Sequence, residues 1–121
     1  MLPLIVEPEA LLPHLNDVLI IDLCREDTYL QAHLPGAVHV KPQDLVSGER
    51  PAVGKLPALD QLEDLFGNIG YAPDKHIVVY DDEGGGWAGR MVWTLDVIGH
   101  QHTSYLNGGI HAWLAAAFAF D

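Results

Sequence analysis

The sequence predicts an α/β fold in which a small parallel sheet carries helices on both faces. Short apolar runs of strand length recur along the 121 residues, and segments with helical spacing of apolar residues lie between them. Turn residues separate the two kinds of segment, and such alternation is typical of a parallel sheet. The strand-like runs lack regular polar positions, which indicates that both of their faces are buried.

Four segments are predicted to be strands of this sheet. Each is short and apolar or rich in β-branched residues, and they span residues 18–22, 37–40, 76–81 and 103–106. In folds of this class the reactive site lies at the carboxyl ends of the strands. The residues that follow Asp22, Val40, Asp81 and Leu106 are therefore the first place to look for a site.

Five segments are predicted to be helices, at residues 9–16, 26–33, 59–69, 86–98 and 110–118. The helix at 59–69 has the clearest amphipathic pattern, because five apolar side chains share one stripe: Leu59, Leu62, Leu65, Phe66 and Ile69. Residues 41–57 are predicted to be a loop, since they contain three prolines and two glycines.

Length and charge exclude several classes of protein. The length fits a single domain spanning residues 1–121. A net charge of −11, with only six lysines and arginines, gives no basic surface for nucleic acid or for an anionic membrane. A single cysteine excludes an internal disulfide, and the start of the chain lacks signal-peptide features. We expect a cytoplasmic protein with no nucleic-acid or membrane partner.

The best candidate site follows the third predicted strand. It consists of three carboxylates and three glycines, in the order Asp81, Asp82, Glu83, Gly84, Gly85 and Gly86, and it opens a helix. Successive backbone N–H groups in such a turn can form a cradle for an anion. The side chains at the entrance of that cradle determine which chemistry is possible.

The loop also shares features with two other kinds of site, a dinucleotide site and a magnesium site. Gly84, Gly86 and Gly89 match the G-x-G-x-x-G pattern of dinucleotide sites, but the acidic residue expected about 20 positions later is missing and the carboxylates would repel phosphate. Carboxylates at a strand end could instead hold Mg²⁺ for phosphoryl transfer, as in response-regulator receivers. The lysine that such receivers carry after their last strand has no counterpart here.

The order of several motifs resembles the rhodanese family over nearly the whole chain. One signature covers residues 21–23 and 29–37, and the others cover 78–81, 88–90, Trp93, 99–100 and 105–113. The run at 80–90 is similar to the amino-terminal half of two-domain bacterial thiosulfate sulfurtransferases. The resemblance implies a three-layer rhodanese-like α/β/α domain with no cofactor.

The sequence departs from the active members of this family at the key position. The resemblance places Asp81 where an active domain carries its persulfide-forming cysteine, and Gly86 where an arginine would fall. A carboxylate cannot carry a sulfane sulfur as a thiolate does. The chain is therefore expected to be a non-catalytic amino-terminal domain without catalytic residues of its own.

The partner implied by the resemblance is a carboxyl-terminal catalytic rhodanese domain of the same protein. The expected interface is the rim formed by Cys24, Arg25, Asp81 and Trp87, and residues 115–121 are expected to begin the interdomain linker. A stand-alone inactive module that binds another protein is the competing interpretation. An enzyme that uses Cys24 as its nucleophile is a third.

Other chemistry-bearing residues are expected to have structural roles. His33 should tie a turn, and the spacing of His100 and His102 could bind a metal only with further ligands that the sequence does not offer. Arg90 is expected to pair with Asp81, Asp82 or Asp96. A further expectation is that the three tryptophans belong to the core: Trp87, Trp93 and Trp113.

Overall fold

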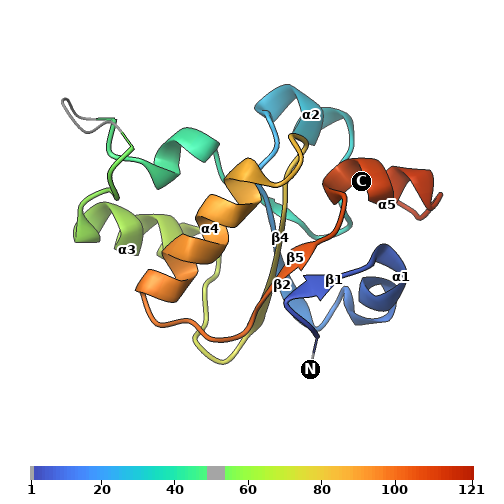
Figure 1. Ribbon diagram of the computed structural model, residues 1–121, viewed down its shortest axis with the longest axis horizontal. Helices are drawn as coiled ribbons and strands as arrows, with labels where there is room; N and C mark the ends of the chain where they lie inside the picture. Colours follow the sequence, from blue (N-terminus) through green and yellow to red (C-terminus); the bar gives the residue numbers. More distant parts are fainter. Residues whose placement is uncertain (1, 49–53) are drawn as a thin grey trace.

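A computed structural model describes residues 2–48 and 54–121 and contains a five-stranded sheet with strand order β1-β5-β4-β2-β3 (Figure 1). All of the strand pairings are parallel. The strands are β1 (Ile5–Val6), β2 (Val18–Asp22), β3 (Val38–His39), β4 (His76–Tyr80) and β5 (Thr103–Leu106). The predicted fold class is confirmed, and the four predicted strands are present.

The helices alternate with these strands as the sequence predicts. They are α1 (Pro8–Leu11), η1 (Leu12–His14), α2 (Glu26–Gln31), η2 (Pro42–Leu45), α3 (Leu59–Asn68), α4 (Gly86–Val97) and α5 (Gly109–Ala115), where η denotes a 3-10 helix. The short helix η2 was not predicted and lies inside the segment expected to be a loop. Residues 49–53 of that loop lie outside the described part of the chain.

The sheet separates two apolar layers. Figure 1 shows α3 and α4 on one side of the sheet and α1 and α5 on the other. Successive residues of β2 alternate between the layers, because Leu19 and Ile21 pack with α3 and α4 while Ile20 packs with α1 and α5. Burial on both faces explains why the strands read as continuous apolar runs.

The edge strand β1 was not predicted from the sequence, because it has only two residues. Val6 is fully buried, whereas Ile5 is 56% exposed on the other face. Its pairing depends on tertiary contacts, since the backbone N–H of Tyr105 donates to the carbonyl of Leu4. No local pattern of two residues can indicate such a pairing.

Two expectations about apolar residues are corrected. Leu59 starts the amphipathic stripe of α3 but is 68% exposed, because it lies in the first turn of the helix. Trp113 is fully buried and Trp87 is partly buried against the core, but Trp93 is 46% exposed on α4. Helical spacing identified the helix, while the tertiary structure decided which of its apolar side chains are covered.

The end of the chain folds back on the domain. The indole N–H of Trp113 donates to the carbonyl of Ala119 over 2.9 Å, and the ring of Phe118 packs against that indole. The backbones of Asp121 and His33 exchange two hydrogen bonds. None of the helices within residues 2–48 and 54–121 has the length and apolar content that a membrane crossing requires.

Candidate functional site

The loop after β4 forms the predicted cradle, and the side chain of Asp81 fills it. One carboxylate oxygen accepts hydrogen bonds from the backbone N–H groups of Glu83 at 3.1 Å and Gly85 at 3.0 Å. The other accepts from the N–H of Ala88 at 2.8 Å, in the first turn of α4. With Asp81 only 1% exposed, these three donors already serve an anion that belongs to the chain itself.

Two glycines allow the loop to close around this carboxylate. Gly85 has a φ of +107°, and a side chain there would also meet the hydroxyl group of Tyr105. Gly109 has a φ of +58°, and an added Cβ would lie 2.1 Å from the carbonyl oxygen of Asp81. The backbone therefore needs glycine at both positions. Gly85 is needed for its positive φ, and Gly109 is needed both for its positive φ and for its close approach to Asp81.

The filled cradle argues against both phosphate alternatives. A pyrophosphate at this helix start would need the N–H groups that the carboxylate of Asp81 already occupies. In the described part of the chain, no group of three His, Cys, Asp or Glu side chains is arranged to hold a metal ion. Neither a nucleotide nor a magnesium site is supported at this loop.

The loop after β2 is organised around a second buried carboxylate. Asp22 accepts hydrogen bonds from the backbone N–H of Cys24 at 2.8 Å and from the hydroxyl of Tyr80 at 2.5 Å. The Tyr80 oxygen in turn accepts from the N–H of Leu34 at 3.1 Å. Burial raises the pKa of Asp22, and burial together with the Asp22 charge raises the pKa of Tyr80. Beneath the surface, this network ties the ends of β2 and β4 to each other and to the segment that carries Leu34 before β3.

Cys24 does not have the environment of a nucleophile. Its side chain is fully buried, and burial followed by the negative charge of Asp22 raises the pKa of its thiol far above the ordinary value. A reactive cysteine needs access and a stabilised thiolate, and Cys24 has neither. The alternative of an enzyme built on Cys24 loses its chemical basis.

The expected rim lies at the carboxyl edge of the sheet. Asp22 pairs in register with His39 of β3 and with Tyr80 of β4, so the loops that follow these strands meet at one edge. Arg25 and Trp87 line a cavity of about 260 Å³ there. Cys24 and Asp81 lie beneath this surface and are buried, so their side chains shape the rim without facing outward.

Several residues of this cavity were not predicted from the sequence, among them two with polar side chains of functional interest. His39 and Lys41 belong to its lining and come from the end of β3 and the loop after it. The ring of Tyr29 stacks on His39 at 4.8 Å and on His33 at 4.0 Å between ring centroids. The signal was present, because the carboxyl end of this strand was already expected to border the site, but the strand was too short for its side-chain directions to be assigned.

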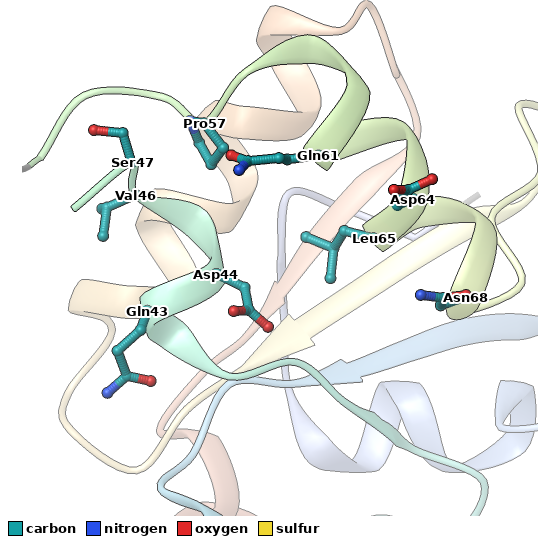
Figure 2. A pocket seen from close by; sticks show the side chains of 9 residues that line it. All are labelled: Gln43, Asp44, Val46, Ser47, Pro57, Gln61, Asp64, Leu65 and Asn68. Atoms are coloured by element: carbon teal, nitrogen blue, oxygen red, sulfur yellow. The ribbon is translucent and has the colours of Figure 1, made fainter. Parts of the chain in front are cut away.

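A second hollow, of about 450 Å³, lies between η2 and α3 (Figure 2). Figure 2 shows Leu65 of α3 and Asp44 of η2 facing each other across it, with Asn68 at one end. It shares Gln43 with the rim cavity, so the two hollows flank the same short helix. Its lining brings together no catalytic group that the sequence singled out.

Arg90 makes different contacts from those expected. One guanidinium nitrogen donates to the carbonyl oxygens of Leu45 at 3.1 Å and Gly54 at 2.8 Å, and the group lies 4.7 Å from the ring centre of Trp93. None of the ion pairs found among the described residues includes Arg90. The predicted pairing with a carboxylate is wrong, and Arg90 instead ties α4 to both sides of the loop after η2.

His33, His76 and His100 make structural contacts. His33 donates from Nδ1 to the carbonyl of Tyr29 at 2.8 Å, as expected for a residue that ties a turn. His100 bonds to the Tyr71 hydroxyl at 2.9 Å, at the edge of the sheet opposite the rim. His76 lies near His100 and His102, and burial and these neighbours lower the pKa of His76.

The lowered pKa of His76 predicts an acid-sensitive fold. As the pH falls through the ordinary value of about 6.5, the unfolded chain binds a proton at His76 before the folded chain does. The free energy of unfolding should therefore decrease between pH 8 and pH 5. Urea unfolding of the native chain and of His76→Gln should show a shallower decrease for the variant, and equal slopes would contradict this role.

Comparisons with known proteins agree with this architecture. The family model described as a rhodanese-like domain matches residues 7–116. A thiosulfate sulfurtransferase of Pseudomonas aeruginosa is 52% identical over 99% of the chain, and one of Azotobacter vinelandii is 50% identical over 94%. The chain spans only 45% and 43% of the lengths of these two relatives.

A solved structure shows the same fold. SseA from Escherichia coli, described as a 3-mercaptopyruvate sulfotransferase with the rhodanese fold, superposes with a TM-score of 0.87 at 28% identity. The match covers 98% of this chain and 50% of that protein. The family model covers most of the chain, two relatives are at least 50% identical to it, and the fold is shared with a solved structure. The chain therefore belongs to the rhodanese-like domain family.

Proposed function

We propose that this chain is a non-catalytic rhodanese domain of a thiosulfate sulfurtransferase, and that it supports a catalytic rhodanese domain by packing against it. In the parent reaction, a cysteine thiolate of the catalytic domain would take the sulfane sulfur of thiosulfate, releasing sulfite, and the resulting persulfide would pass that sulfur to an acceptor such as cyanide, giving thiocyanate. The proposed contribution of this domain is a preformed rim at the carboxyl edge of its sheet.

The occupied cradle is the observation that carries the proposal. A loop that could stabilise a sulfur anion through its N–H groups has those groups bound to the carboxylate of Asp81. The single thiol, Cys24, is buried and lies after a different strand. A domain with neither a free cradle nor an accessible thiolate lacks the parts that sulfur transfer requires.

The share of the relatives that the chain covers supports a role within a longer protein. Both bacterial thiosulfate sulfurtransferases are more than twice as long as the region that matches. This favours a domain of a tandem protein over a stand-alone interaction module. The parent gene provides a direct check, because a stop codon directly after Asp121 would contradict the tandem arrangement.

The isolated chain is expected to produce no thiocyanate from thiosulfate and cyanide. The reason is chemical, since neither Asp81 nor the buried Cys24 can form a persulfide on the rim. The measurement is colorimetric detection of thiocyanate, with Cys24→Ser as the matched variant. Activity that Cys24→Ser abolishes would overturn the non-catalytic assignment.

Replacing Asp81 by cysteine is also expected to give no activity. The variant restores the nucleophile type, but Gly86 still stands where the resemblance expects an arginine. The same assay applies, and substantial thiocyanate formation by Asp81→Cys would show that the loop lacks only its thiol.

The rim itself can be tested in the full-length parent protein. Trp87→Ala should lower the sulfur-transfer rate, because Trp87 lines the exposed cavity at the proposed interface. Trp93→Ala is the matched control, since Trp93 is exposed on α4 and borders a different hollow with Leu4 and Thr103. Equal effects of the two variants on kcat/KM would contradict a specific role for the rim.

A further inference from the structure

The rim cavity combines a partly enclosed shape with charges of both signs. Its volume of about 260 Å³ falls just below the roughly 300–1,000 Å³ of sites for drug-sized ligands, so it suits a smaller molecule. Three loops contribute to the lining: Arg25 follows β2, Lys41 follows β3, and Glu83 follows β4. Loops at the carboxyl ends of parallel strands are the usual ligand-binding region of such a sheet.

The order of the strands separates the opposite charges. Because β2 lies between β3 and β4, the loops that carry Lys41 and Glu83 flank the cavity from its two sides. Arg25 lies between them. Glu26 also belongs to the lining, so two cationic and two anionic side chains border the cavity. The guanidinium of Arg25 is bonded to Asp27 at 2.7 Å, whereas Lys41 and Glu83 face the cavity without forming an ion pair among the described residues.

One wall suits an aliphatic group. Trp87 is partly buried and lines the cavity, and the buried Leu23 and Pro42 also belong to the lining, whereas His39 and Gln43 contribute polar groups. A ligand with a single charge fits this lining poorly. An anion would meet Glu83, and a cation would meet Lys41. A molecule that carries both charges can satisfy both flanks at once.

We propose that the rim cavity binds a small zwitterion of the α-amino-acid class with an aliphatic side chain. Its carboxylate faces Lys41, its ammonium group faces Glu83, and its side chain lies against Trp87. Both ends then form charge-assisted hydrogen bonds in a partly enclosed site. This binding property goes beyond the proposed function, because it needs no catalytic domain and no sulfur chemistry.

The test is a titration of the ¹⁵N-labelled 121-residue chain with L-leucine, followed by NMR. The indole N–H signal of Trp87, assigned with Trp87→Phe, should shift in a saturable way. N-acetyl-L-leucine lacks the ammonium group and L-leucinamide lacks the carboxylate, and each should bind at least about tenfold more weakly. Equal affinity for all three molecules, or no saturable shift with L-leucine, would overturn the proposal.

Two variants assign the charges to their partners. Lys41→Ala should weaken L-leucine binding by about tenfold or more but leave the weak binding of L-leucinamide unchanged. Glu83→Gln should show the reverse selectivity, by weakening L-leucine but not N-acetyl-L-leucine. Lys75→Ala is the control, because Lys75 is exposed and lies outside the cavity lining. Loss of binding in that control, or unchanged selectivity in both rim variants, would count against the assigned contacts.

The outcome is separable from that of the proposed function. Sulfur transfer by the isolated chain would overturn the non-catalytic role and leave the titration as it stands. Failure of the titration, with thiocyanate formation confined to the longer protein, would overturn the zwitterion site alone.

Discussion

Replacing Gly109 by alanine is expected to lower the free energy of unfolding by about 3 kcal/mol, from the sum of left-handed backbone strain and overpacking. An added Cβ would lie 2.1 Å from the carbonyl oxygen of Asp81, a contact that only a shift of the backbone can relieve. The N–H of Ile110 donates to the same carbonyl, so the shift would also disturb this hydrogen bond. Urea unfolding followed by circular dichroism measures the change.

The matched control for this substitution is Gly36→Ala. Gly36 has a φ of +79°, and nothing lies within 4 Å of an added Cβ there. It isolates the backbone strain, which is expected to cost about 1 kcal/mol. Equal losses of unfolding free energy in the two variants would mean that the close approach of Gly109 to the carbonyl oxygen of Asp81 does not affect stability.

Removing the carboxylate of Asp81 is expected to have the second large effect. Asp81→Ala leaves three buried or partly buried N–H groups without their acceptor, and the expected loss is about 3 kcal/mol of unfolding free energy. Asp81→Asn should be intermediate, because one of its two side-chain positions becomes a donor that faces an N–H group. Thermal and urea unfolding of the three proteins measure the series.

The neighbouring Asp82 provides the control for this series. One of its oxygens accepts a single hydrogen bond of 3.4 Å from the N–H of Arg25. Asp82→Ala is therefore expected to cost less than about 1 kcal/mol, in the range of a single weak hydrogen bond. A loss as large as that of Asp81→Ala would show that total charge, and not the filled cradle, governs the stability of the loop.

An added anion should partly replace the missing carboxylate. In Asp81→Ala, sulfate or thiosulfate can occupy the vacated cradle and should raise the midpoint of thermal unfolding more than it does in the native chain. Comparing the two proteins at equal ionic strength removes the general stabilisation that sulfate gives to folded proteins. Equal shifts in both proteins would mean that the N–H groups do not form an anion site.

The Asp81 variants also test the position at which this chain differs from active rhodanese domains, where the resemblance expects a cysteine. In the native chain a carboxylate on a short side chain satisfies the loop permanently, and no ligand is needed to hold the loop in place. A loop held by its own carboxylate agrees with the proposed role, in which this domain presents a preformed surface to a catalytic domain.

The long elements could be predicted from sequence because their patterns are local. The apolar runs of β2 and β4 and the amphipathic stripe of α3 each extend over at least five residues, and the structure places elements at those positions. The two-residue strands are different. β1 was missed and β3 was located only approximately, because such short strands depend on their neighbours in the sheet.

Two errors arose where a side chain had several possible partners. Arg90 was expected to bind a nearby carboxylate, but backbone carbonyls of a distant loop lie within its reach. Trp93 follows the helical spacing of core residues, yet nearly half of its surface is exposed, at the border of a hollow that it shares with Leu4 and Thr103. Sequence spacing gives the direction of a side chain around its helix, but it does not say what stands opposite.

The sequence by itself determined the fold class, the position of the glycine-rich loop after β4 and the absence of a cysteine from that loop. These follow from local periodicity and from residue identity at one position. Only the tertiary structure decided that the Asp81 carboxylate fills the cradle, that Cys24 is buried, and that Lys41 and Glu83 face one cavity. The physical reason is that burial and charge separation depend on strands and loops that are distant in sequence and come together only when the parallel sheet forms.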